Sequence, residues 1–125
     1  MSKPASTGNP AVVFKILSSS DWAEAQLRGS YAGSADDERD GFIHLSTGAQ
    51  VAGTAARHFQ HKPDLVLVAL ECAKLGADLV WEPSRGGALF PHLYAPLPVS
   101  AALWCKDMPL GTDGVPQVPG DIETC

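Results

Sequence analysis

Short runs of apolar residues, each bounded by Gly, Pro, Asp or Ser, recur along the chain and predict β-strands. The run Leu65–Leu70 contains no polar residue, so we expect it to be a central strand with both faces buried. The first run contains one charged residue, Lys15. The expected strands cover residues 11–17, 42–46, 65–70, 79–82 and 99–105.

Two stretches show the apolar spacing of amphipathic helices. One spans about residues 22–28 and is followed by a glycine, a common helix terminator. The other spans about residues 48–60, and we expect Thr47 and Gln50 to form a capping box at its start. Residues 30–40, between the two helices, are polar and are predicted to be a loop with its acidic run exposed to solvent. Several strands with two main helices indicate an α+β fold.

The chain of 125 residues is long enough for one hydrophobic core, which we place in residues 11–108. Residues 1–10 are predicted to be disordered, and residues 109–125, rich in Pro and Gly, are predicted to form an extended tail. No apolar run approaches the roughly 20 residues that cross a bilayer, so we expect no membrane association. The N-terminus lacks the apolar segment of a secretion signal, and the three cysteines are widely spaced, so we expect a cytoplasmic protein.

The net charge of −5 at pH 7 argues against binding to double-stranded nucleic acid, which needs a basic face. Four basic residues nevertheless lie near apolar segments, so a pocket between those segments can be locally basic. These residues are Lys15, Arg39, Arg57 and Arg85. The sequence has no nucleotide P-loop, no G-x-G-x-x-G motif and no metal-ligand spacing, so we expect no metal site.

The stretch Asp40–Gln50 places a histidine and two hydroxyl groups between a predicted buried strand and a predicted helix start. His44 lies near the end of the strand, and Ser46 and Thr47 follow it. The free backbone N–H groups and the dipole at the start of a helix favour an anion there. A structural role, with His44 in the core and Thr47 as a helix cap, explains the same residues, so the stretch alone leaves both interpretations open.

A second cluster of polar and aromatic residues spans residues 81–94. Glu82 can act as a base or accept hydrogen bonds from sugar hydroxyls, and His92 titrates near neutrality. Trp81 and Tyr94 offer flat faces for a nucleobase or a nicotinamide ring.

The loop inside this cluster has the composition of an anion-binding turn. Arg85 carries a planar fork that suits phosphate or carboxylate. Gly86 and Gly87 let the backbone come close to a ligand. The alternative is a structural loop in which Glu82 and Arg85 form an ion pair around a glycine turn.

Several of these segments resemble domain-of-unknown-function family 952, over about residues 12–108. The resemblance is carried by Phe14-Lys15-Ile16, by residues 40–47 and by residues 81–94. A more distant resemblance connects residues 43–46 and 65–71 to RNA 2′-phosphotransferases, which belong to the ADP-ribosyltransferase-like superfamily. It implies a small split mixed sheet and a nucleotide-like ligand, with NAD as a substrate rather than a resident cofactor. We expect a monomer or a weak dimer.

This resemblance implies an enzyme that acts on NAD or on a related ADP-ribosyl or phosphorylated nucleotide. The implied catalytic residues are His44, Glu82 and His92. His44 would hold a ribose hydroxyl or a phosphate, and Glu82 or His92 would stabilise the sugar or transfer a proton. The implied ligand-binding residues are Ser46, Thr47, Trp81, Arg85, Gly86, Gly87 and Tyr94. The superfamily usually has a His in its first strand, and here Lys15 interrupts that strand, so a binding module without catalysis is the alternative.

Overall fold

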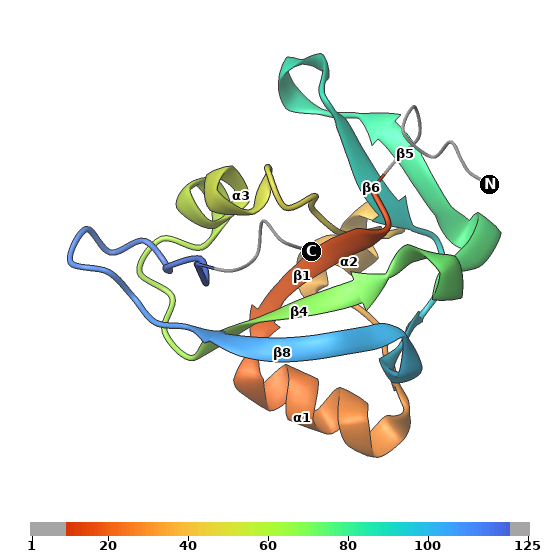
Figure 1. Ribbon diagram of the computed structural model, residues 1–125, viewed down its shortest axis with the longest axis horizontal. Helices are drawn as coiled ribbons and strands as arrows, with labels where there is room; N and C mark the ends of the chain where they lie inside the picture. Colours follow the sequence, from red (N-terminus) through yellow and green to blue (C-terminus); the bar gives the residue numbers. More distant parts are fainter. Residues whose placement is uncertain (1–9, 121–125) are drawn as a thin grey trace.

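The computed structural model describes residues 10–120, and within this range the chain forms two three-stranded sheets, a two-stranded ribbon and three α-helices (Figure 1). The predicted α+β class is therefore confirmed. The segment expected to be disordered, residues 1–10, lies outside the described residues except for Pro10. Within residues 10–120 no helix is long and apolar enough to cross a membrane.

The first sheet has the order β1-β4-β8, with β1 at Val12–Ser18, β4 at Leu65–Glu71 and β8 at Ala102–Met108. The predicted central strand is thus confirmed. Strands β1 and β4 run antiparallel. The start of β4 therefore lies beside the end of β1, where the backbone N–H of Ser19 donates to the carbonyl of Asp64 at 2.8 Å. All strand pairs in the described residues are antiparallel, so the expectation of a mixed sheet is wrong for this part of the chain.

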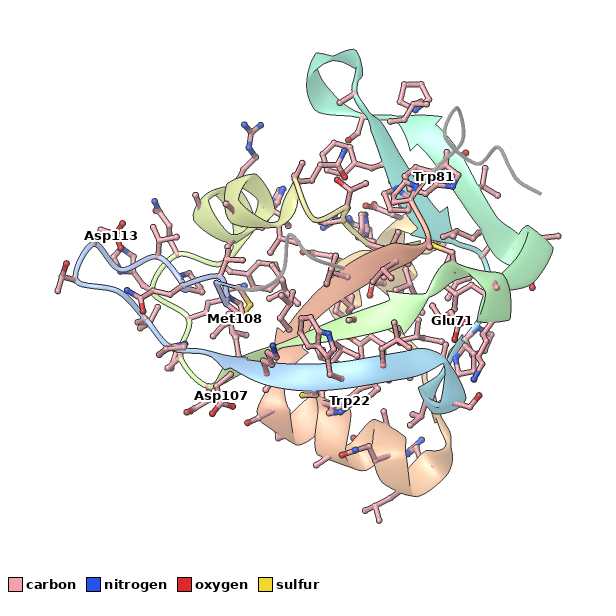
Figure 2. The ribbon with its side chains drawn as sticks, viewed as in Figure 1. Trp22, Glu71, Trp81, Asp107, Met108 and Asp113 are labelled. Carbon is pink, nitrogen blue, oxygen red and sulfur yellow. The ribbon has the colours of Figure 1, made fainter. Side chains whose placement is uncertain are left out.

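The two faces of this sheet are covered by different elements (Figure 1). Helix α1, Ser19–Arg28, packs on one face, and helix α3, Val51–His58, packs on the other. Figure 2 shows Trp22 between α1 and the sheet and Met108 toward the α3 side. The side chains of residues 65–70 in β4 alternate between the two hydrophobic clusters, which explains why this run has no polar residue.

The second sheet has the order β3-β6-β5, with β3 at Ile43–His44, β6 at Leu89–Leu93 and β5 at Leu79–Pro83. The 3-10 helix η4, Arg85–Gly87, closes the hairpin between β5 and β6. An isolated bridge between Phe14 and Ser46 joins this part of the fold to β1. The remaining elements are β2 at Ser30–Tyr31, β7 at Leu97–Pro98, and the 3-10 helices η2 (Cys72–Lys74), η3 (Gly76–Asp78) and η5 (Val99–Ala101).

A third helix, α2 at Ala35–Asp40, stands where a loop was predicted. The side chain of Ser34 accepts a hydrogen bond from the backbone N–H of Asp37, and the Asp37 carboxylate accepts one from the N–H of Ser34. This capping box starts the helix, and Gly41, at φ 86°, ends it. The prediction of a solvated acidic loop was wrong because Asp37 turns inward and is buried.

The start of α3 also differs from the prediction. The helix begins at Val51 rather than Gly48, because the carbonyl of Thr47, not its hydroxyl, accepts the N–H of Gln50 at 3.0 Å. Thr47 therefore begins a turn that precedes the helix, and its hydroxyl does not cap the helix. The backbone N–H of Thr47 donates to Gln50 Oε1 at 3.0 Å, so only the glutamine half of the expected capping box forms. The last strand begins at Ala102 rather than Val99, since residues 99–101 form η5.

The segment that follows β8 was expected to be an extended tail, but residues 109–120 fold back over the α3 side of the sheet. Val115 and Val118 pack against the hydrophobic cluster that contains Phe14 and Met108. The backbone N–H of His61 donates to the carbonyl of Gly114 at 2.7 Å. This part of the tail is thus attached to the core, and residues 121–125 lie outside the described residues.

Candidate functional site

A cleft with a volume of about 530 Å³ lies between α2, α3, β1 and the β5–β6 hairpin. Its size is typical of small-molecule sites. Side chains from all of these elements line it, including Lys15, Asp37, His44, Arg57 and His92. Among the residues that the structure describes, three cationic residues and three aspartates line the cleft, so this part of its wall does not share the net negative charge of the whole chain.

A buried ion pair forms the inner wall of the cleft. Lys15 Nζ lies 3.1 Å from Asp37 Oδ2, and the two side chains are only 6% and 2% exposed. Lys15 also donates to the carbonyl of His44 at 3.0 Å. Burial lowers the pKa of Lys15, and the charge of Asp37 opposes that shift. Burial alone would raise the pKa of Asp37, but the hydrogen bond with His44 and the charge of Lys15 hold it well below its usual range.

The ring of His44 is held between two carboxylates. Its Nδ1 lies 2.6 Å from Asp37 Oδ1, and its Nε2 lies 2.9 Å from Asp40 Oδ2. The hydrogen bond with Asp37 raises the pKa of His44, and partial burial opposes this. Carboxylate oxygens only accept, so the geometry fits an imidazolium that donates from both nitrogens. Arg39 fixes Asp40 from the other side, with Nε 3.0 Å from Oδ1.

The ring of His92 has a different environment. Its Nδ1 lies 2.7 Å from Glu82 Oε1, and the hydroxyl of Tyr94 donates to the same oxygen at 2.7 Å. These hydrogen bonds, that with His92 first, lower the pKa of Glu82. The Glu82 carboxylate is therefore the hydrogen-bond acceptor, and Nδ1 of His92 is the donor. His92 lines the cleft, and within the described residues no side chain is hydrogen-bonded to its Nε2 atom.

Phe42 holds the two histidine rings in place. Its ring stacks on His92 with a centroid separation of 3.9 Å and an interplanar angle of 22°. It also contacts the rings of His44 at 4.6 Å and Tyr94 at 5.3 Å. These rings therefore form one aromatic cluster beside the cleft.

Residues 16–105 match the family described as "Protein of unknown function (DUF952)". The chain belongs to this family. It is 53% identical to protein CC0527 from Caulobacter crescentus, whose crystal structure superposes with a TM-score of 0.82 over 85% of this chain and 93% of that one. The solution NMR structure of CC0527, 52% identical over 86% and 93% of the two chains, gives a TM-score of 0.77. No match was found among curated proteins.

The DUF952 fold brings some of the predicted site residues together. His44, Ser46 and His92 line the cleft, and Glu82 and Tyr94 contact each other beside His92. Ser46 is buried, and its hydroxyl lies 3.0 Å from that of Thr54.

Other predicted site residues of this DUF952 chain lie elsewhere. Thr47 and Trp81 are not among the residues that line the cleft. Trp81 precedes Glu82 in β5, so the two side chains lie on opposite faces of the strand, and Trp81 packs against the hydrophobic core. Gly86 and Gly87 form the hairpin turn with φ of 78° and 84°, while the side chain of Arg85 lies outside the described part of the structure.

Sequence reasoning missed the roles of Lys15, Asp37 and Asp40. Two signals were available in the sequence of this DUF952 protein. Ser34 followed three residues later by Asp37 is a capping-box pattern. A lysine inside an apolar strand requires a nearby carboxylate if it is buried.

Proposed function

We propose that the cleft of this DUF952 protein binds NAD or a related ADP-ribosyl or phosphorylated nucleotide, and that the protein transfers the ADP-ribosyl group in the cytoplasm. The observation that carries this proposal is the 2.7 Å contact between Glu82 and His92, because His92 lines a cleft large enough for a nucleotide. A carboxylate that fixes the tautomer of a histidine prepares its second nitrogen to accept a proton. The resemblance of residues 43–46 and 65–71 to RNA 2′-phosphotransferases supports the superfamily assignment.

In the proposed transfer step, the proton acceptor is a side chain of this protein, His92. Nε2 of His92 takes the proton of an acceptor hydroxyl as that oxygen bonds to C1 of the nicotinamide ribose. The glycosidic C–N bond breaks, and neutral nicotinamide leaves with the bonding electrons. Glu82, which accepts the hydrogen bond from Nδ1 of His92, stabilises the imidazolium that forms.

His44 has a less direct place in this proposal. Both of its ring nitrogens already bind carboxylates, so it can hold a ribose hydroxyl only if that hydroxyl replaces Asp40 at Nε2. Asp40 is partly exposed at the rim, where such a replacement disturbs little. The binding of both His44 nitrogens to carboxylates also favours the second candidate function. That candidate is a non-catalytic module that binds the nucleotide in the cleft and leaves it intact.

The two candidates differ in turnover and share ligand binding. The test measures nicotinamide release from NAD by chromatography, with RNA and protein acceptors present, together with the melting temperature in the presence of NAD or ADP-ribose. At 100-fold excess over its Kd, a ligand adds about 2.7 kcal/mol of stability. We expect E82Q and H92Q to lower turnover roughly 100-fold or more and to keep most of the ligand-induced shift.

Glu24, an exposed carboxylate on α1, provides the matched control, and E24Q keeps full turnover. If the unmutated protein is stabilised by NAD but never cleaves it, the binding module is the correct function. If neither NAD nor ADP-ribose raises the melting temperature, both candidates are wrong.

A further inference from the structure

Arg57 on α3 differs from the other described cations that line the cleft. Lys15 is paired with Asp37, and Arg39 is paired with Asp36 and Asp40. Arg57 is exposed and lines the cleft, and no carboxylate in residues 10–120 forms an ion pair with it. Its guanidinium is thus available to an anionic ligand.

Gly53 lies on the same face of α3 and has no structural reason to be a glycine. It lies inside the helix, where Gly is less stable than Ala, and its φ is not positive. A Cβ built at this position meets no atom within 4 Å. Because Gly53 lines the cleft, the missing side chain leaves the helix backbone open to a ligand.

Two neighbours on α3 fix this face in position. Gln50 donates from Nε2 to the carbonyl of Leu89 at 2.8 Å, which ties the start of α3 to β6. The Thr54 hydroxyl lies 3.0 Å from that of Ser46. Residues 50, 53, 54 and 57 recur at the spacing of one helix face, and all four line the cleft.

We propose that this face of α3 is a phosphate-binding subsite that takes the pyrophosphate of the nucleotide ligand. Arg57 forms forked hydrogen bonds to phosphate oxygens, and the pyrophosphate lies against the backbone at Gly53. The identity of the nucleotide rests on the proposed function, whereas phosphate binding by this face does not.

The first test compares ligands with and without phosphate by calorimetry at fixed ionic strength. The probes are ADP-ribose, inorganic pyrophosphate and nicotinamide riboside, which carries no phosphate. We expect R57Q to weaken ADP-ribose and pyrophosphate about 10- to 100-fold and to leave the riboside unchanged. R57K restores only part of the loss, because an ammonium lacks the fork. The matched control is R28Q, which alters an exposed arginine on α1 and leaves all three affinities unchanged.

The second test uses G53A, which separates binding from stability. We expect the substitution to raise the melting temperature, since Ala favours the helix, and to weaken ADP-ribose, since the new methyl group occupies the subsite. G120A, at an exposed glycine whose added Cβ also meets no atom within 4 Å, leaves the affinity unchanged.

The outcomes separate this subsite from the proposed function. ADP-ribose that binds equally well to the unmutated protein and to R57Q overturns the subsite and leaves the proposed function in place. Pyrophosphate binding that depends on Arg57, in a protein that binds neither NAD nor ADP-ribose, supports the subsite and overturns the proposed function. No binding of pyrophosphate or ADP-ribose overturns the subsite.

Discussion

His44 and His92 face each other across β3 and β6 as a registered pair, with ring centroids 5.8 Å apart, and their hydrogen bonds give them different chemistry. In the part of the chain that the structure describes, His44 has a carboxylate at both ring nitrogens, whereas His92 has one only at Nδ1. The first histidine is suited to carry a positive charge. In the proposed function, the second accepts a proton at Nε2.

The positive charge on His44 predicts a pH dependence of stability. Because the folded state raises its pKa above the ordinary value of 6.5, its stabilising contribution is complete below that value and is lost as pH rises through the folded pKa. We expect the free energy of unfolding to fall as the pH rises above 6.5 and through the raised pKa of His44, and this fall to be smaller in H44Q. Urea denaturation at a series of pH values on both sides of 6.5 measures it. H61Q, at an exposed histidine, keeps the fall, and an equal fall in H44Q contradicts the assignment.

The Lys15–Asp37 pair predicts a large difference between two adjacent aspartates. D37N leaves the Lys15 ammonium buried without its counter-ion, so we expect a loss of about 3–5 kcal/mol in the free energy of unfolding. D36N removes an exposed carboxylate from the same helix, and a change of only about 0.5 kcal/mol is expected. Equilibrium unfolding in urea measures both. Similar losses in the two variants would show that breaking the buried ion pair costs no more stability than removing an exposed carboxylate.

The pairing of Lys15 with Asp37 also shows where sequence reasoning reached its limit. Helix α1 and strand β4 could be predicted, because each is specified by local apolar spacing and by a glycine or a turn at its end. The acidic run in α2 was read as solvated, because its counter-ion is 22 residues away in the chain. Only the folded arrangement shows that one of those aspartates turns inward.

The candidate site was predicted in part for the same reason. His92 and Glu82 were both recognised, but ten residues separate them and their contact depends on the register of the hairpin. In that register Val80 pairs with His92, so Glu82 lies diagonally beside the histidine. Trp81 is adjacent in sequence but points to the other face of the sheet, because strand residues alternate.

The C-terminal segment predicts a contribution to stability that its composition did not indicate. Val115 and Val118 are partly buried against the α3-side cluster. We expect the double variant V115A/V118A to lose about 1–3 kcal/mol, the scale of the methyl groups removed from this cluster. L27A alters a side chain that is 90% exposed and changes stability little. Thermal and urea unfolding measure both variants, and an unchanged double variant would mean that the segment is not held by this packing.

The stacking of Phe42 on His92 predicts an effect on turnover that is separate from ligand affinity. F42L keeps an apolar side chain and removes the ring that lies 3.9 Å from His92. An aromatic pair of this kind contributes about 0.5–1.5 kcal/mol, so loss of the orientation that it provides lowers turnover about 2- to 10-fold. The Kd of ADP-ribose stays the same, because the ring of Phe42 does not line the cleft.

This effect must be smaller than that of E82Q, since Phe42 only positions the histidine while Glu82 stabilises its charge. W104L provides the control, because it removes another aromatic contact, that with Phe14 at 5.8 Å, away from His92. We expect W104L to lower the melting temperature without changing turnover per folded molecule. Nicotinamide release measured beside calorimetric affinity separates the two effects. A variant F42L with full turnover would show that the stacking does not orient His92 for proton transfer.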